Sequence, residues 1–139
     1  MESRNIRVLL VDDEMDFLEP VSFWLQSKGY TVSTALDGKQ ALEAVTQSPP
    51  PDIVFLDINM PQMNGLETLR AIRAISRELP VIMVTAVYQD EKNFSQASEL
   101  GIAGFFPKHT SLSELVRIIE TSLRAHTKLK RPAGENPAE

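Results

Sequence analysis

The sequence contains no cysteine and no long hydrophobic run. Without cysteine, disulfides, thiolate metal sites and cysteine nucleophiles are all excluded. The longest apolar run near the N-terminus, Val8–Val11, is too short for the hydrophobic part of a secretory signal. No segment approaches the roughly 20 apolar residues that a membrane span needs. We therefore expect no leader, no membrane association and a cytoplasmic location.

The chain also lacks an excess of basic residues. Its 139 residues include 14 Lys and Arg against 19 Asp and Glu, which gives a formal net charge of -5. Such a balance provides no basic field for nucleic acid or for an anionic membrane, so we expect no direct nucleic-acid binding. The length and the 42% apolar content are typical of one globular domain with its own core.

Short apolar runs alternate with stretches of helical periodicity along the chain. Strands are expected at Ile6–Val11, Tyr30–Thr34, residues 53–57, Pro80–Thr85 and Ala103–Phe106, and helices at Glu14–Lys28, Gly38–Gln47, Gly65–Ser76, Glu91–Leu100 and Ser111–His126. Five such β-α units predict a single α/β domain, a (βα)5 parallel sheet with helices on both faces. Pro20 predicts a kink or a late start of the first helix. Ser111 and Glu114 predict a capping box at the last.

The last residues of the chain differ in composition from the rest. Residues 127–139 carry basic residues and two prolines, but Leu129 is their only large apolar residue. So little apolar surface adds little to a core. We therefore expect a domain over residues 1–126, followed by a flexible tail or the start of a linker.

Polar residues follow the predicted strands where each strand ends. Asp12 and Asp13 follow the first strand, Asp57 ends the third, Thr85 ends the fourth, and Lys108 follows the fifth. Functional sites in open α/β sheets lie beyond the carboxyl ends of the strands. These five residues are therefore expected to be neighbours.

Three adjacent carboxylates repel one another and call for a compensating cation. Mg²⁺, with Mn²⁺ as an alternative, prefers oxygen ligands and is commonly held by one or two carboxylates and a phosphate. Lys108 and Thr85 can donate hydrogen bonds to phosphoryl oxygens. Asp57 is then the expected nucleophile, and it would form an acyl phosphate.

Each of these residues has a simpler interpretation when it is taken alone. Asp12 and Asp13 could cap a helix, Lys108 could be a solvated surface lysine, and Thr85 could merely end a strand. Phe105 could be a core residue. The occurrence of such residues at the ends of successive strands favours a functional site.

Four motifs carry a resemblance to a known family. They are Val11-Asp12-Asp13-Glu14, Leu56-Asp57-Ile58-Asn59-Met60-Pro61 with Gly65 beyond it, Thr85-Ala86, and Phe105-Phe106-Pro107-Lys108. In this order and spacing, they resemble the receiver domain of two-component response regulators over residues 6 to about 126. The resemblance implies the flavodoxin-like strand order 2-1-3-4-5, which the general description of this fold already gives for the chemotaxis receiver.

The resemblance implies a role for each site residue. Asp57 would be the phosphoacceptor. The other implied roles are Mg²⁺ coordination by Asp12, Asp13, Asp57 and the backbone carbonyl of Asn59, phosphoryl binding by Thr85 and Lys108, and an inward turn of the Phe105 side chain on activation. The family generally catalyses only its own phosphorylation and dephosphorylation, so we expect no other enzyme activity.

The sequence departs from the family pattern at two positions. His109 follows Lys108, where the family usually has a proline with a cis peptide. Val87, two residues after Thr85, is apolar where relatives often carry a polar residue that assists water attack. We expect Val87 and Asn59 to set the phosphoryl lifetime, and self-dephosphorylation to be slow.

The resemblance also implies partners and a switch. The expected phosphodonor is a sensor histidine kinase or a phosphotransfer protein. Phosphorylation would reshape the surface made by Glu91–Leu100, Ala103–Phe106 and Ser111–His126, which would act on an unspecified output partner or fused effector domain. A phosphorylation-dependent homodimer is a further expectation.

Three other interpretations belong to different classes of protein. An FMN binder would need a phosphate-binding loop after the first strand, where Asp12-Asp13-Glu14 repels phosphate. An aspartate-nucleophile phosphohydrolase would usually have a second acid at the position of Asn59. A degenerate receiver that only binds proteins would be expected to have lost some of the five polar groups.

Overall fold

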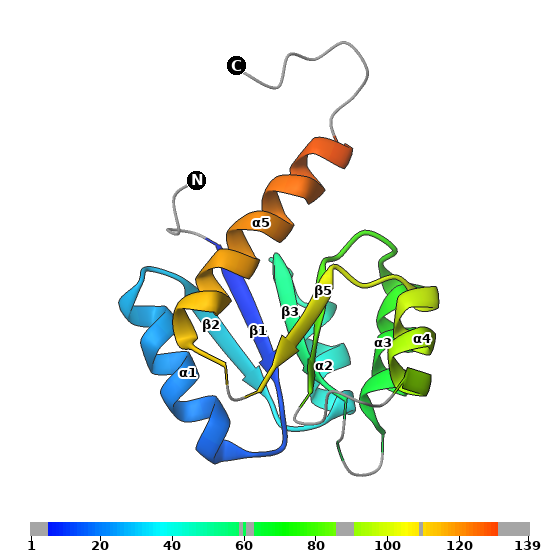
Figure 1. The fold of residues 1–139 in the computed structure, drawn as a ribbon, viewed down its shortest axis with the longest axis horizontal. Helices are drawn as coiled ribbons and strands as arrows, with labels where there is room; N and C mark the ends of the chain where they lie inside the picture. The colour runs from blue at the N-terminus through cyan, green and yellow to red at the C-terminus, as the bar shows by residue number, and fades with distance from the viewer. Residues whose placement is uncertain (1–5, 59, 61–62, 86–90, 109, 131–139) are drawn as a thin grey trace.

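One parallel sheet organises the molecule. The computed structural model describes residues 6–58, 60, 63–85, 91–108 and 110–130. Five strands pair in parallel in the order β2-β1-β3-β4-β5 (Figure 1). The elements are β1 (Arg7–Val11), α1 (Met15–Ser27), β2 (Thr31–Ala35), α2 (Gly38–Val45), β3 (Ile53–Asp57), α3 (Gly65–Ile75), β4 (Val81–Thr85), α4 (Glu91–Leu100), β5 (Gly104–Pro107) and α5 (Leu112–Lys130). The predicted fold class and strand order are confirmed.

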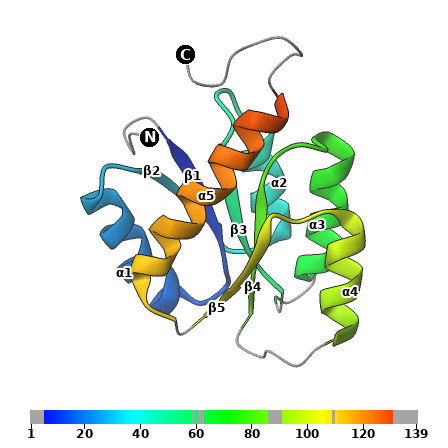
Figure 2. The same ribbon diagram turned by 45° about the horizontal axis from the view of Figure 1, so that its top comes forward.

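Helices cover both faces of the sheet. Figures 1 and 2 show α1 and α5 on one face and α2, α3 and α4 on the other. Side chains of one strand alternate between the two faces: Val8 and Leu10 pack with the α1 and α5 residues, whereas Leu9 and Val11 pack with those of α2, α3 and α4. Because β1 is buried on both faces, its sequence is apolar almost without interruption.

Three helix ends bear on the sequence predictions: the start of α1 and both ends of α5. α1 begins at Met15 and contains Pro20, so a late start of this helix is excluded. α5 extends to Lys130, beyond the predicted end near His126. No proline lies between His126 and Lys130, so the chain can continue the helix there. The Ser111 hydroxyl accepts a hydrogen bond from the backbone N–H of Ser113, not from that of Glu114 as a capping box requires.

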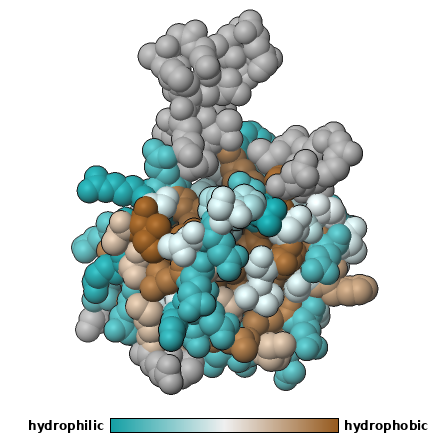
Figure 3. Space-filling model, turned by 180° about the vertical axis from the view of Figure 1, so that it is seen from behind, coloured by the Kyte–Doolittle hydropathy of each residue, from teal (hydrophilic) through white to brown (hydrophobic). Residues whose placement is uncertain are grey.

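The outer surface mixes hydrophobic and hydrophilic residues. Figure 3 shows this mixture on the face opposite to the one seen in Figure 1. In the part of the chain that the structure describes, the large hydrophobic side chains that are exposed are Met15, Phe23, Leu36 and Ile75. Among the described residues, no helix is long and apolar enough to cross a membrane.

The strand register places the candidate site residues at one edge of the sheet. Val11 pairs with Leu56, so Asp12 and Asp57 follow at the same level of β1 and β3. Thr85 pairs with Pro107, and the backbone N–H of Lys108 donates to the Thr85 carbonyl at 2.8 Å. The carboxyl ends of four neighbouring strands thus present their polar groups together, as the sequence predicted.

Candidate functional site

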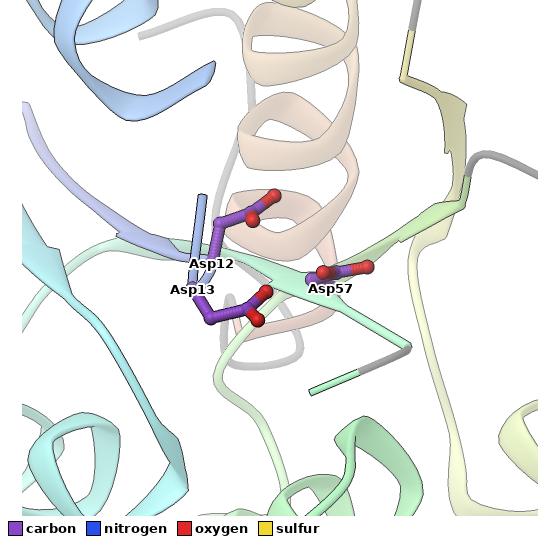
Figure 4. A group of neighbouring side chains, drawn as sticks. All are labelled: Asp12, Asp13 and Asp57. Carbon is purple, nitrogen blue, oxygen red and sulfur yellow. The ribbon is translucent and has the colours of Figure 1, made fainter. Parts of the chain in front are cut away.

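Three carboxylates form the acidic part of the site. Asp12 and Asp13 follow β1 and Asp57 ends β3, and ligand oxygens of the three lie within 4.8 Å of one another (Figure 4). Asp12 and Asp57 are buried, whereas Asp13 is exposed. The backbone N–H of Asp12 donates to the Ala35 carbonyl at 3.0 Å, which extends the β1–β2 pairing and fixes the position of this residue. The predicted acidic cluster is therefore present.

Lys108 reaches into this cluster from the end of β5. Its Nζ lies 2.9 Å from Asp12 Oδ2, 3.2 Å from Asp12 Oδ1 and 3.8 Å from Asp57 Oδ2. It also donates a hydrogen bond to Glu14 Oε1, and it lies 5.1 Å from the centroid of the Phe17 ring. Only 7% of Lys108 is exposed, so the alternative of a solvated surface lysine is excluded.

Burial and charge raise the pKa values of both Asp12 and Lys108, but burial acts in opposite directions on the two groups. Burial raises the pKa of Asp12 above its usual range, although hydrogen bonds from Lys108 and from the Glu14 backbone oppose this shift. Burial by itself lowers the pKa of Lys108, but hydrogen bonds to Glu14 and Asp12 and the charge of Asp57 outweigh it, so the pKa is raised. Lys108 is therefore a cation at neutral pH.

The acidic cluster has the donor chemistry of a divalent cation site. Within the described part of the chain, Asp12 Oδ2 receives no hydrogen bond of good geometry, even though Lys108 Nζ is 2.9 Å away. The Lys108 ammonium compensates one negative charge, whereas three ionised carboxylates carry three, so a further cation would be stabilised at this site. Oxygen ligands of this kind suit Mg²⁺.

Thr85 ends β4 at the edge that carries the acidic cluster, whereas Phe105 lies within β5, further from the strand ends. Thr85 is 7% exposed and is the last residue of β4, one position beyond Val84, which pairs with Asp57. Phe105 pairs with Met83 and is partly buried against the core beneath α2, α3 and α4. Both residues therefore lie where the sequence placed them.

The segment after Asp57 is packed tightly against α3. A Cβ on Gly65 would lie 2.3 Å from the Asp57 carbonyl oxygen and 2.6 Å from Ile58 Cα, so only glycine fits there. The Gly65 N–H donates to the Ile58 carbonyl at 2.9 Å. Asn64 and Glu67 form a capping box at the start of α3.

Sequence reasoning missed two of these contacts. The capping box was detectable, because Asn64 and Glu67 have the required spacing before a helical stretch. The contact of Glu14 with Lys108 had no comparable signal, because it joins side chains 94 residues apart. Two residues with predicted roles, Asn59 and Val87, lie outside the described residues, as does His109, where the sequence departs from the family pattern.

Fold and site together define the class of the protein. A doubly wound parallel sheet with three carboxylates, a buried lysine and a hydroxyl beyond its strand ends is the arrangement of a receiver domain. The family model described as "Response regulator receiver domain" matches residues 8–120. The chain therefore belongs to the response regulator receiver family.

Curated and structural relatives agree with this assignment. The chain is 36% identical over 118 residues to the transcriptional regulatory protein PrrA of Mycobacterium leprae, which covers 85% of this chain and 50% of the relative. Chemotaxis protein CheY4 of Vibrio cholerae superposes with a TM-score of 0.77 at 33% identity, over 84% of this chain and 97% of that one. NtrX of Brucella abortus superposes with a TM-score of 0.81 at 29% identity, over 89% of this chain and 28% of the NtrX chain. The chain thus spans about half the length of the curated relatives that it matches.

Proposed function

We propose that this receiver accepts a phosphoryl group on Asp57 from a phosphohistidine of a sensor kinase or a phosphotransfer protein. The observation that carries the proposal is the position of Asp57. Asp57 is 4% exposed, shares a cluster with Asp12 and Asp13, and has the Lys108 ammonium 3.8 Å from its Oδ2. A nucleophile and cationic groups on both flanks of a transferred phosphoryl group are what this reaction requires.

The proposed transfer is a single displacement. One carboxylate oxygen of Asp57 forms a bond to phosphorus while the P–N bond of the phosphohistidine breaks, and the electron pair of that bond stays on the imidazole nitrogen. Lys108 and the Thr85 hydroxyl donate hydrogen bonds to the phosphoryl oxygens. Asp57 thereby becomes an acyl phosphate, and the protein changes no other substrate.

Asp12, Asp13 and Asp57, with the backbone carbonyl of Asn59, would hold Mg²⁺ in this proposal. The ion, when bound, neutralises charge on the phosphoryl oxygens. The clustering of the three carboxylates, whose ligand oxygens lie within 4.8 Å of one another, supports the assignment.

Phosphorylation adds about -1.5 to -2 charges and new acceptor oxygens at Asp57. Thr85 and Lys108 are drawn toward them, Phe105 turns inward, and the surface of α4, β5 and α5 changes shape.

This surface would act on an output. The matched relatives are about twice as long as this chain, which suits a fused effector domain. A separate output partner and a homodimer are the other outputs that we propose for this surface. We place the reaction in the cytoplasm, where the family's kinases present their phosphohistidine.

Acetyl phosphate offers the direct test of this function. With Mg²⁺ and acetyl phosphate, the intact protein should gain the mass of one phosphoryl group, and a chelator should prevent the gain. The phosphohistidine form of a kinase should transfer the same group. A protein that stays unmodified with both donors would be a degenerate receiver that only binds other proteins.

Mg²⁺ should stabilise the fold even without a phosphodonor. A ligand at 100 times its dissociation constant contributes about 2.7 kcal/mol to the free energy of unfolding, so thermal unfolding should shift upward by several degrees. The shift should shrink in Asp13→Asn, which removes an exposed carboxylate of the cluster, and should persist in Asp16→Asn, which removes an exposed one outside it. Equal shifts in both variants would mean that Mg²⁺ acts only by screening charge.

Val87 should lengthen the life of the acyl phosphate, because its side chain cannot orient a water molecule. We therefore expect Val87→Glu to hydrolyse faster once the phosphodonor is removed, as followed by the decay of the phosphorylated mass. If the lifetime of the acyl phosphate shortens little in Val87→Glu, Val87 does not determine this lifetime, and Asn59 is the remaining candidate.

A further inference from the structure

The ammonium of Lys108 is held on the β1 side of the site, away from Asp57. Among the described residues, its hydrogen-bond acceptors are Glu14 Oε1 and Asp12 Oδ1, whereas Asp57 Oδ2 is 3.8 Å away, beyond hydrogen-bond distance. The Phe17 ring centroid lies 5.1 Å from Nζ and adds a cation–π attraction on that side. A lysine that is to bind a phosphoryl group on Asp57 has to leave these contacts.

We propose that Glu14 is a positioning residue that holds the Lys108 ammonium away from Asp57 and thereby slows phosphorylation. The inference rests on the proposed function, because it concerns the rate at which the same site accepts a phosphoryl group.

Neither helix capping nor core packing explains the position of the Glu14 carboxylate. It is the N-cap residue of α1, but its side chain makes no capping hydrogen bond. The side chain is 63% exposed, so it is not part of the core. Its backbone N–H donates to Asp12 Oδ1 at 2.9 Å, and any residue at this position except proline can keep that bond.

A bound divalent cation would affect Asp12 and Glu14 differently as acceptors for the Lys108 ammonium. Once Asp12 coordinates a divalent cation, its oxygens become weaker acceptors for Lys108. Glu14 is not in the acidic cluster of Asp12, Asp13 and Asp57, so its carboxylate stays available to the ammonium. Its restraint on Lys108 therefore persists in the state that reacts with the phosphodonor.

The size of the effect follows from the exposure of Glu14. An ion pair with one exposed partner contributes about 0.2–1 kcal/mol, so its removal should change a rate by up to about fivefold. Glu14→Gln keeps the side-chain length and removes the charge. We expect this variant to be phosphorylated by acetyl phosphate about two- to fivefold faster than the parent protein at saturating Mg²⁺.

A matched control separates positioning from a general charge effect. Asp16→Asn removes one negative charge from an exposed side chain in the first turn of α1. Glu14→Asp keeps the charge but shortens the side chain, so it should lose the contact with Lys108. If Glu14 acts by positioning Lys108, Glu14→Asp should be phosphorylated faster than the parent protein, and Asp16→Asn should be phosphorylated at the parent rate. A faster Asp16→Asn with a parental Glu14→Asp would overturn the proposal.

A double-mutant cycle tests whether Glu14 acts through Lys108. In a Lys108→Ala background, Glu14→Gln should leave the slow phosphorylation rate unchanged, and an acceleration equal to that in the parent background would contradict the proposal. Because all rates are compared with that of the parent protein, the proposed function and the role of Glu14 can be refuted independently of each other. No adduct in the parent protein defeats the proposed function, whereas an adduct formed at the same rate in Glu14→Gln defeats only the role of Glu14.

Discussion

Asp57→Asn should abolish phosphorylation. The amide has nearly the shape of the carboxylate, but its oxygen is a poor nucleophile and forms no stable acyl phosphate. Asp57 is 4% exposed at the end of β3, so no other group takes its place in the acidic cluster without rearrangement. Intact mass spectrometry after incubation with Mg²⁺ and acetyl phosphate should show the parent adduct and none in the variant.

The control for this variant lies at the other end of the same strand. Asp52 is exposed just before β3 and accepts a hydrogen bond from the Arg7 backbone N–H at 2.8 Å. Asp52→Asn keeps an oxygen for that bond and should be phosphorylated like the parent. Circular dichroism should show that both variants are folded. If a folded Asp57→Asn protein still gains a phosphoryl group, the phosphoacceptor is a residue other than Asp57.

Gly65→Ala should damage both stability and phosphorylation. The new Cβ would meet the Asp57 carbonyl oxygen at 2.3 Å, and this neighbour is backbone, so α3 and the end of β3 have to separate. Overpacking costs about 1–3 kcal/mol, and more where backbone must shift. We expect the free energy of unfolding, measured with urea, to fall by an amount at the upper end of this range. Phosphorylation should also be slower, because Asp57 moves.

Gly104→Ala is the matched control for the glycine prediction. A Cβ on Gly104 would lie 3.7 Å from Ile82 Cδ1, which is ordinary van der Waals contact with a side chain. Gly104 begins β5, so the substitution also places alanine in a strand. The free energy of unfolding should change by less than about 1 kcal/mol. If both glycine variants were equally stable, the close approach of α3 to Asp57 would not be a constraint.

The sequence was sufficient to predict the sheet and the composition of the site. Apolar runs ended by polar residues identify strands that are buried on both faces, and parallel pairing brings the ends of those strands together. Asp12, Asp57 and Thr85 therefore lie at one edge in the structure, as their positions at strand ends predicted. The strand order came from the family resemblance, because periodicity alone does not determine which strands are neighbours.

Side-chain contacts within the site could not be predicted in the same way. Strand ends place Lys108 near the carboxylates, but its long side chain could lie beside any of them. The choice of Asp12 and Glu14 over Asp57 depends on rotamers and on burial, which have no sequence signature. The length of α5 was also missed, because the polar residues after His126 resemble a tail while being compatible with a last helical turn.

Chemical location of the phosphoryl group is the most direct test of the central claim. Borohydride reduces an acyl phosphate to an alcohol, so the phosphorylated aspartate would become homoserine. Trypsin separates the candidates, because cleavage after Lys39 and Arg70 releases Asp57, whereas Asp12 and Asp13 remain in the peptide that ends at Lys28. Tandem mass spectrometry should find homoserine in place of Asp57 only after treatment with Mg²⁺ and acetyl phosphate. Homoserine in the peptide that ends at Lys28, or in neither peptide, would contradict the account.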